Sequence, residues 1–550
     1  MTRRQPGSHR VLEPPRATLF SRLPSAWALV TVLLGAVLAL AVARVPILTP
    51  DLWWHLATGE FIASHGIPRT DPFSYTLAGR AWTAHEWLAD VAWARVFAAG
   101  DLNAVVWLRV ALVMLAWWGS YRLARVHASR AISLAWLLAA VWVSQRNWLD
   151  RPQLWSFVLL PWVLFLLERT RLHARRRIWA LPALFAAWVN LHGGFMLGIV
   201  LLIGWTTAPL VARRADRRMR TRIPILIASL AATFVNPYGL GGVLYPLGYV
   251  GSGLSATIQE EKPGALDSSF AWVHAGLVVA TLAVVIARRR RIPLEHLWVV
   301  GVLAWLSMPR VAGLALPFAA ERHAPLFLHA CVPMLAWYAF RLARLHRIEA
   351  RGWALGRAAA AWVAMIAMAG FGLWEVQRAW PRPARPSDRV LAGRFPIAAA
   401  DWIARESLPS RLLNPYRWGG YLAFRLHPHQ SVWIDSRGDL YGAERLREDE
   451  ILHRFAPALA AAAERLIARD DPDVIVWPLL SLDFGALRVH PFTRWIEQRS
   501  DWRLVFFDGP DPARPRAPWA TTAVFLRVHP RNAPWLARLP AVSLPAGLPL

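Results

Sequence analysis

Long apolar runs, separated by short arginine-rich loops, constrain this chain more than any other feature of its sequence. Several of these runs reach the roughly 18 to 20 residues that a helix needs to cross a bilayer. The 550 residues are 56% hydrophobic, and they carry a formal net charge of +27 that comes from arginine. The sequence therefore predicts a polytopic α-helical membrane protein.

The strongly arginine-rich loops all fall on one side if successive apolar runs cross in alternate directions. This positive-inside distribution puts the N-terminus in the cytoplasm. It differs from the basic face of a nucleic-acid-binding protein, so no nucleic-acid partner is expected. About eleven membrane spans follow from the pattern, at 23–45, 103–123, 132–148, 152–167, 178–191, 193–211, 223–238, 272–287, 294–308, 324–340 and 354–374.

The pattern changes after residue 378, where three prolines mark a linker and no later run is long enough to cross a bilayer. We expect a transmembrane domain over residues 1–378, with an outer loop at 47–102 in which 86–99 forms an interfacial helix. Residues 379–550 are predicted to form a soluble α/β domain on the outer side. Its predicted helices are 398–406 and 444–468, and its predicted strands are 432–434, 474–477, 503–507 and 523–528.

Ionisable residues concentrate in the first outer loop, between segments that are otherwise apolar. If the stretch after Pro50 is helical, Asp51 and His55 lie one turn apart on the same face. Such a cluster at a membrane boundary is costly, which makes it a candidate functional site. The alternative is an interfacial loop anchored by tryptophans, in which Asp51 caps a helix.

Further polar residues lie at the outer ends of separate spans and therefore share one depth. They include Arg151, His192, Arg310, Arg322 and His323. A carboxylate near several arginines suits an anionic group, such as a lipid phosphate, held beside a general base. The alternative is that each residue anchors its own helix end and is paired locally.

A divalent cation is a weaker possibility. Asp51, His55, His85 and Glu86 are hard or borderline ligands, although their spacing is not specific for a metal. The single cysteine, Cys331, excludes an intrachain disulfide.

The first outer loop resembles that of the GT-C fold glycosyltransferases that use polyprenyl-phosphate sugars, such as protein O-mannosyltransferases and aminoarabinose transferases. These enzymes have an essential acidic residue just after the first membrane helix, where this chain has Asp51. The chain departs from the family at Leu52, where an acidic residue is common, and at 84–86, where the family has a Lys-Pro-Pro element.

Four short motifs also resemble a group of uncharacterised bacterial membrane proteins. They are Asp-Leu-Trp-Trp-His at 51–55, Asn-Leu-His-Gly-Gly at 190–194, Trp-Gly-Gly-Tyr at 418–421 and Ile-Asp-Ser-Arg at 434–437.

The resemblance implies transfer of a sugar from a polyprenyl-phosphate donor to an envelope acceptor, on the outer face of a bacterial inner membrane. It implies that Asp51 accepts a proton from, or orients, the acceptor hydroxyl, and that His55 orients Asp51. Arg151, Arg310, Arg322 and His323 would hold the donor phosphate, and His85, Glu86 and His192 would contact substrate.

The soluble domain would bind the acceptor or gate the cavity. Trp418, Tyr421, Asp435, Arg437 and Asp439 suit a carbohydrate-binding surface, but we slightly favour a role for them in the core and turns of a small domain. The alternative function is that of a non-enzymatic lipid-glycan transporter or envelope-assembly protein. The absence of repeated halves in the sequence, and the placement of charges at span ends, favour the enzyme.

Overall fold

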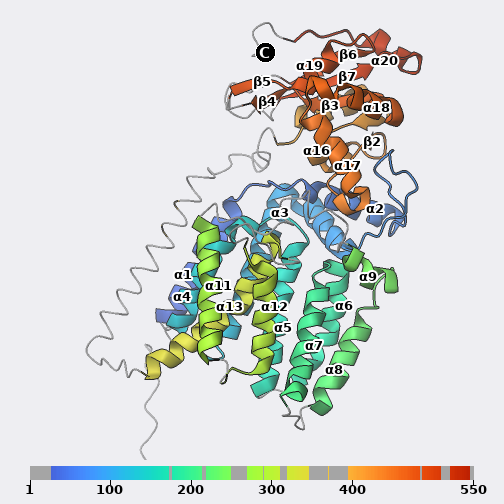
Figure 1. Cartoon of the computed structure of the whole chain (residues 1–550). Coiled ribbons are helices and arrows are strands. Elements are labelled where there is room, and N and C mark those ends of the chain that lie inside the picture. Colours follow the sequence, from blue (N-terminus) through green and yellow to red (C-terminus); the bar gives the residue numbers. More distant parts are fainter. Residues whose placement is uncertain are drawn as a thin grey trace, which may run out of the picture.

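The computed structural model describes residues 26–172, 176–212, 219–248, 269–288, 290, 292–309, 319–345, 370, 374, 394–483, 486–508 and 521–544. Within these residues, a bundle of roughly parallel helices carries a smaller C-terminal domain, which contains a β-sheet, on one end (Figure 1). The boundary predicted at 378/379 lies outside the described residues.

The bundle consists of apolar helices that largely coincide with the predicted spans. They are α1 (Ala26–Arg44), α3 (Trp87–Ala124), α4 (Arg130–Ser144), α5 (Gln153–Leu172), α6 (Leu181–Leu191), α7 (Phe195–Val211), α8 (Met219–Ala232), α11 (Ser269–Arg288), α12 (Leu294–Ser307) and α13 (Ala324–Leu345). The short helix α9 (Leu240–Gly248) follows a turn after α8. The predicted span 354–374 lies almost entirely outside the described residues.

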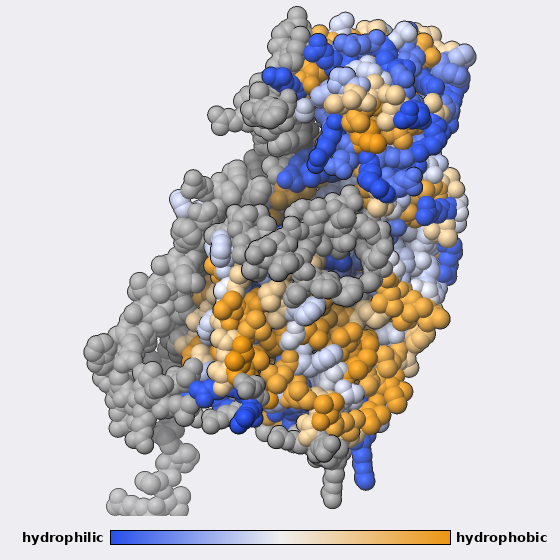
Figure 2. Space-filling model, viewed as in Figure 1, coloured by the Kyte–Doolittle hydropathy of each residue, from blue (hydrophilic) through white to orange (hydrophobic). Residues whose placement is uncertain are grey.

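Hydrophobic side chains cover most of the visible face of the bundle, whereas the C-terminal domain is largely hydrophilic (Figure 2). Large apolar side chains such as Trp107, Ile227 and Val279 are exposed on the bundle. Two described helices, Trp87–Ala124 and Phe270–Arg288, are long and apolar enough to cross a bilayer, and four shorter apolar helices accompany them. The eleven-span topology stays a prediction.

A layer formed by α2 (Asp51–His65) and the first part of α3 lies between the bundle and the C-terminal domain (Figure 1). The backbone of α3 leaves the helical conformation at Gly100 and Asp101, which separates the predicted interfacial helix from the predicted span. Gly59 lets α2 lie directly on α3, because a Cβ at this position would come within 2.2 Å of the Asp90 carbonyl oxygen.

The C-terminal domain is built around a five-stranded sheet in the order β2-β1-β3-β7-β6. β1 is parallel to β2 and β3, whereas β7 is antiparallel to β3 and β6. The strands are β1 (Arg411–Leu413), β2 (Ser431–Val432), β3 (Val474–Pro478), β6 (Trp502–Phe507) and β7 (Thr522–Arg527), and β4 (Leu480–Asp483) pairs with β5 (Ala486–Val489) in a separate hairpin. The helices are α15 (Ile397–Glu406), α16 (Tyr416–Leu426), α17 (Gly438–His453), α18 (Ala460–Asp470), α19 (Pro491–Glu497) and α20 (Ala533–Arg538).

One predicted helix of this domain is wrong in extent. The stretch 444–468 forms parts of two helices, α17 and α18, with a short 3₁₀ turn at Pro457–Leu459 between them. Ala456 is extended, as residues before proline tend to be, because the proline ring excludes the helical conformation there. The sequence reasoning also missed β1, α16 and the β4-β5 hairpin, which are short and lack a long periodic pattern.

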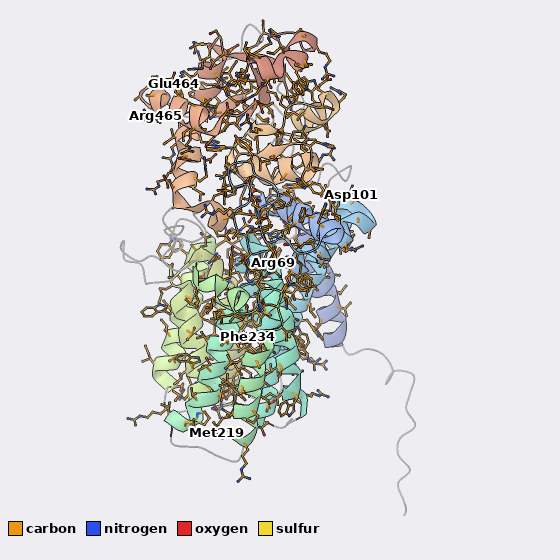
Figure 3. All side chains as sticks on the ribbon, turned by 90° about the vertical axis from the view of Figure 1, so that its right-hand side faces the viewer. Arg69, Asp101, Met219, Phe234, Glu464 and Arg465 are labelled. Atoms are coloured by element: carbon orange, nitrogen blue, oxygen red, sulfur yellow. The ribbon has the colours of Figure 1, made fainter. Side chains whose placement is uncertain are left out.

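The side view in Figure 3 shows how these layers follow one another. Met219 lies near the end of the bundle remote from the C-terminal domain, Arg69 lies at the junction, and Glu464 and Arg465 lie on the C-terminal domain.

Candidate functional site

The site centres on an ion pair at the junction. Asp51 is the first residue of α2, and its Oδ2 lies 2.9 Å from Nε of Arg151, which lies two residues before the start of α5. Thr49 ties the two together, because its hydroxyl accepts hydrogen bonds from Arg151 Nε (2.8 Å) and from the Asp51 backbone N–H (3.2 Å). Both charged side chains are about one-fifth exposed, so a substrate could reach them.

A fully buried ion pair fixes the residue that precedes Arg151 in the chain. Arg109 Nη1 on α3 donates to Asp150 Oδ2 at 2.7 Å, and its Nη2 donates to the carbonyl oxygens of Val42 and Val45 at the end of α1. Such a pair is costly to break because each charge would lose its partner away from water. The position of Arg151 is therefore fixed by three helices.

The second part of the site is a carboxylate surrounded by imidazoles. Glu86 lies just before α3, and its oxygens face Nε2 of His85 (3.5 Å), His192 (3.6 Å) and His55 (3.9 Å). His55 in turn contacts Asp90 through Nδ1 at 2.6 Å. The structure thus brings together the predicted residues His55, His85, Glu86 and His192. His55 lies one helical turn after Asp51 in α2.

Hydrogen bonds assign the tautomer of His192. Its Nδ1 accepts from the Gly194 backbone N–H (2.9 Å) and contacts the Ser156 hydroxyl (2.7 Å), which itself accepts from Trp188 Nε1. The proton of the neutral ring therefore sits on Nε2, on the side that faces Glu86. Gly194 is required here, because a Cβ would lie 2.3 Å from the Ser156 oxygen.

Burial and charge set the protonation states around Glu86. Burial lowers the pKa of His55 to about 3, so this ring is neutral at pH 7. Burial alone would raise the pKa of Glu86, but His85, followed by His192 and His55, outweighs it and lowers the pKa to about 2. Glu86 conversely raises the pKa of His85 against the effect of burial. The cluster is an ionised carboxylate with one imidazole that favours the charged form.

Arg322 and His323 lie in a 3₁₀ turn just before α13. Burial, with smaller effects from His85 and Arg322, lowers the pKa of His192 to about 4, which places Arg322 on the same side of the junction. His323 Nδ1 is 3.2 Å from the Leu306 carbonyl oxygen, so this ring fastens the turn to α12. Arg310 lies outside the described residues.

The C-terminal domain also reaches the site. Tyr245 on α9 donates to Asp439 on α17, and its ring stacks on His85 with centroids 4.4 Å apart. Tyr416, the first residue of α16, lies within the electrostatic reach of Asp51. The junction is therefore closed by residues from both domains.

Four of the five residues considered for a carbohydrate surface are buried, as the favoured assignment to the core of the domain predicts. Trp418, Tyr421, Asp435 and Arg437 are each less than 6% exposed. Tyr421 packs against Trp53 of α2, and Arg437 pairs with Asp71 of the outer loop and with Asp435 of its own domain. The outer loop and α2 therefore cover this side of the C-terminal domain. Asp439 alone of the five is part-buried and faces the junction.

The possible cation site is not formed in the described part of the chain, where no group of three or more His, Cys, Asp or Glu side chains could hold a metal ion. Asp51 faces Arg151 rather than His55, and His55 Nδ1 faces Asp90.

Asp90, Arg109 and Tyr245 were not singled out as site residues from the sequence. Asp90 carried a usable signal, because it follows Glu86 by four residues and so lies on the same helical face. Tyr245 carried none, since its helix lies far along the chain from His85.

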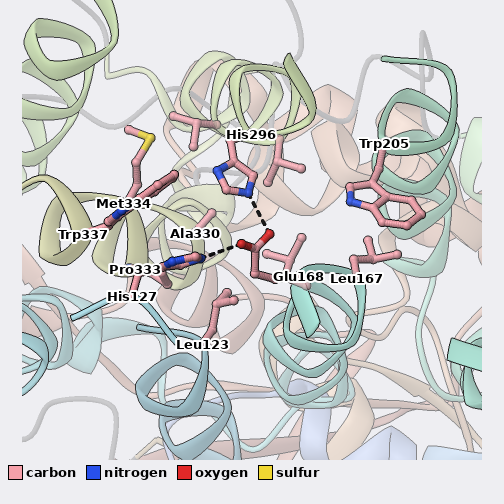
Figure 4. A pocket seen from close by; sticks show the side chains of 13 residues that line it. Leu123, His127, Leu167, Glu168, Trp205, His296, Ala330, Pro333, Met334 and Trp337 are labelled. Carbon is pink, nitrogen blue, oxygen red and sulfur yellow. Dashed lines mark hydrogen bonds and ion pairs between the residues drawn. The ribbon is translucent and has the colours of Figure 1, made fainter. Parts of the chain in front are cut away.

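A second polar cluster surrounds Glu168 near the C-terminal end of α5, and Figure 4 shows it beside a pocket. Glu168 on α5 accepts from Nε2 of His127 (2.5 Å) and of His296 (2.8 Å), and from Arg171 (2.5 and 2.8 Å). The adjoining cavity of about 60 Å³ has mainly apolar walls, including Trp205. Hydrogen-bond donors already surround the Glu168 carboxylate. We therefore interpret this cluster as a structural contact that joins α5 to α12 and to the end of α3.

No protein-family model and no curated protein matches the chain. Solved structures do match it. AglB oligosaccharyltransferase from Archaeoglobus fulgidus, in the apo form, superposes with a TM-score of 0.57 at 11% identity over 83% of this chain and 70% of that chain. The same enzyme in complex with an inhibitory peptide and a dolichol-phosphate gives 0.54 at 11% identity, over 82% and 69%.

ArnT from Cupriavidus metallidurans bound to undecaprenyl phosphate gives a TM-score of 0.53 at 14% identity, over 92% of this chain and 98% of that chain. Both enzymes are GT-C glycosyltransferases. The chain has the GT-C fold. This confirms the resemblance inferred from the first outer loop, and in the GT-C fold of this chain Asp51 opens the helix at the junction of the two domains.

Proposed function

We propose that this chain is a membrane glycosyltransferase that transfers a sugar from a polyprenyl-phosphate donor to an envelope acceptor. The single observation that carries the proposal is the Asp51–Arg151 pair, set beside the Glu86 cluster in a chain with the GT-C fold. A carboxylate and a guanidinium that share a part-exposed position offer both groups that the reaction needs.

In the proposed reaction, the acceptor oxygen forms a bond to the anomeric carbon of the sugar while the bond from that carbon to the phosphate oxygen breaks. Asp51 orients the acceptor hydroxyl by accepting its hydrogen bond and receives its proton. Polyprenyl phosphate leaves with the bonding electrons. Arg151 and Arg322, with Arg310, stabilise the negative charge that develops on the phosphate.

The Glu86 cluster would hold the donor from the other side. The His85 imidazolium can pair with a phosphate oxygen, and Glu86 keeps that ring charged. His192 presents its Nε2–H in the same direction and can donate to a phosphate or a sugar hydroxyl. Asp439 and Tyr416 would line the side from which the acceptor enters.

The test uses the full-length chain in lipid nanodiscs with undecaprenyl-phosphate-linked sugars carrying a radiolabel. We expect release of undecaprenyl phosphate that depends on an added envelope extract, with label recovered in the acceptor. Vesicle transport of the labelled lipid without cleavage of its sugar-phosphate bond would instead support the transporter.

The location we propose is a bacterial inner membrane, with the site and the C-terminal domain on the outer face. Single cysteines introduced as Arg465→Cys on the C-terminal domain and Arg220→Cys at the remote end of the bundle are both exposed, whereas the native Cys331 is buried. An impermeant thiol reagent added to whole cells with a permeabilised outer membrane should label only the first. Labelling of only the second would overturn the orientation.

A further inference from the structure

We infer that the C-terminal domain positions Asp51, and that Gly420 on α16 is the residue through which it does so. The inference rests on the proposed function. It also assigns a role to the Trp-Gly-Gly-Tyr and Ile-Asp-Ser-Arg motifs, which the transfer chemistry does not use.

The backbones of α16 and α2 approach each other closely at Gly420. A Cβ at this position would lie 3.0 Å from the Pro50 carbonyl oxygen and 3.3 Å from the Trp54 backbone nitrogen. These two atoms belong to the first turn of α2, which contains Asp51. The preceding residue, Gly419, faces the C-terminal domain, where a Cβ would lie 1.8 Å from the Ile434 carbonyl oxygen. Helix α16 therefore packs closely both against its own domain and against the turn that contains Asp51.

Trp53 fixes the rotation of α2 about its axis. Its buried ring packs against Tyr421 (centroids 4.8 Å apart), Phe395 (5.4 Å) and Phe424 (5.6 Å), all from the C-terminal domain. Asp51 precedes Trp53 by two residues and so points roughly 200° away around the helix. Seating Trp53 in the C-terminal domain thus turns Asp51 toward Arg151 on the other side.

A second attachment prevents the outer loop from moving independently of this contact. Buried Arg437 Nη2 lies 2.8 Å from Asp71 Oδ1 in the loop and 2.6 Å from Asp435 Oδ2 in its own domain. Its guanidinium also covers the ring of Trp82 at 4.5 Å. The backbone adds a hydrogen bond of 3.0 Å from the Val432 N–H to the Phe73 carbonyl oxygen.

The competing explanation is an interface that stabilises the fold and has no effect on transfer. Substitution of Gly420 distinguishes a stabilising interface from one that positions Asp51. Glycine inside a helix lowers helix stability by about 1 kcal/mol relative to alanine. A merely structural α16 should therefore tolerate alanine well, since the Cβ needs only a small adjustment. If α16 positions Asp51, the Gly420 variants should lose turnover although they retain the fold.

The variants are Gly420→Ala and Gly420→Val in the full-length chain, with Gly301→Ala on α12 as the matched control. Gly301 is also a helical glycine, but a Cβ there would meet nothing within 4 Å. We expect kcat to fall several-fold for Gly420→Ala and about 10²-fold for Gly420→Val, as misplacement of a reacting group by about 1 Å does, with the donor KM little changed. Wild-type kcat in both folded variants would overturn the inference.

Hydrogen exchange of a peptide covering residues 50–58 gives a readout that needs no turnover. We expect faster exchange in Gly420→Val than in wild type, because displacement of this turn destabilises the N-terminal end of α2, and no change in Gly301→Ala. If wild type transfers no sugar, the proposed function fails, and this exchange still decides the positioning. Unchanged exchange in Gly420→Val would refute it.

Discussion

Asp51 and Arg151 are separated by a hundred positions in the chain, yet Arg151 Nε lies 2.9 Å from Asp51 Oδ2. Asp51 is the first residue of α2, Arg151 lies two residues before α5, and Thr49 bridges them. The carboxylate that would orient the acceptor and the guanidinium that would hold the phosphate are therefore in direct contact.

Arg151→Gln should reduce both donor binding and turnover. The glutamine cannot carry the charge that balances Asp51 or stabilises the leaving phosphate, and charge-assisted hydrogen bonds contribute about 1.5 to 3 kcal/mol each. We expect kcat/KM for the donor to fall at least tenfold. Arg146→Gln is the control, because Arg146 is exposed and pairs with Glu321 at 3.6 Å. Equal kinetics for the two variants would remove Arg151 from the site.

The pH dependence of donor binding should reflect His85. Burial opposes the charge on this ring, but Glu86 outweighs burial and raises the pKa above 6.5. The stability and the phosphate affinity that the imidazolium provides are fully present below pH 6.5 and are lost as pH rises through the raised pKa. A plot of kcat/KM against pH should therefore fall on the alkaline side in wild type, and His85→Gln should remove that fall. An unchanged alkaline limb in the variant would assign it to another group.

Asp449 on α17 should make the protein less stable at high pH. Burial raises the pKa of Asp449 to about 7, although its Oδ1 accepts a hydrogen bond from the Tyr416 N–H at 3.0 Å. A carboxyl whose pKa is higher in the folded state stabilises the fold at low pH, and this contribution is lost as pH rises from about 4 to about 7. Asp449→Asn keeps the acceptor for Tyr416 and should raise the unfolding free energy at pH 8 by up to about 4 kcal/mol, with little effect at pH 4.

Thermal unfolding at the two pH values tests this directly. Glu450→Gln, at the exposed neighbouring position, is the control and should change stability little at either pH. A destabilised Asp449→Asn at pH 8 would show that the part-buried Asp449 carboxylate stabilises the fold in its charged form.

Glu168→Gln should lower stability without changing the chemistry of the transfer site. It removes the charge that Arg171 and the two histidines surround, and breaking a buried ion pair costs about 3 to 5 kcal/mol. We expect a clear fall in the thermal midpoint and a kcat per folded molecule close to wild type. A selective loss of kcat at unchanged stability would mean that this cavity takes part in the reaction (Figure 4).

The helical part of the fold was predictable because apolar run length is a local property of the sequence. The helix ends of α7 and α12 agree with the predicted ranges to within two residues. The break at Gly100 and Asp101 was also predictable, because apolar residues thin out there. In contrast, α16 was missed, since eleven residues with two adjacent glycines form a helix only where they can pack closely on a partner.

The site was predictable in its residue types and only partly in its pairings. The shared outer placement of Asp51, Arg151 and His192 follows from topology, and the structure brings them to the same junction. Two further contacts join Arg437 to Asp71 and Tyr245 to His85. Both link segments that are far apart in the chain, so no local sequence pattern predicts them. The sequence left Arg437 open between a binding surface and the domain core, and its buried contacts with Asp71 and Asp435 place it in the core.

The most direct measurement is the turnover of a polyprenyl-phosphate sugar by Asp51→Asn beside wild type. Asparagine keeps the size of the side chain and one acceptor oxygen but loses the charge and the ability to take a proton. We predict a fall in kcat of about 10²- to 10⁴-fold, with donor binding and the thermal midpoint largely retained. Glu60→Gln, an exposed carboxylate at the far end of the same helix, should behave as wild type. Wild-type turnover by Asp51→Asn would contradict the account.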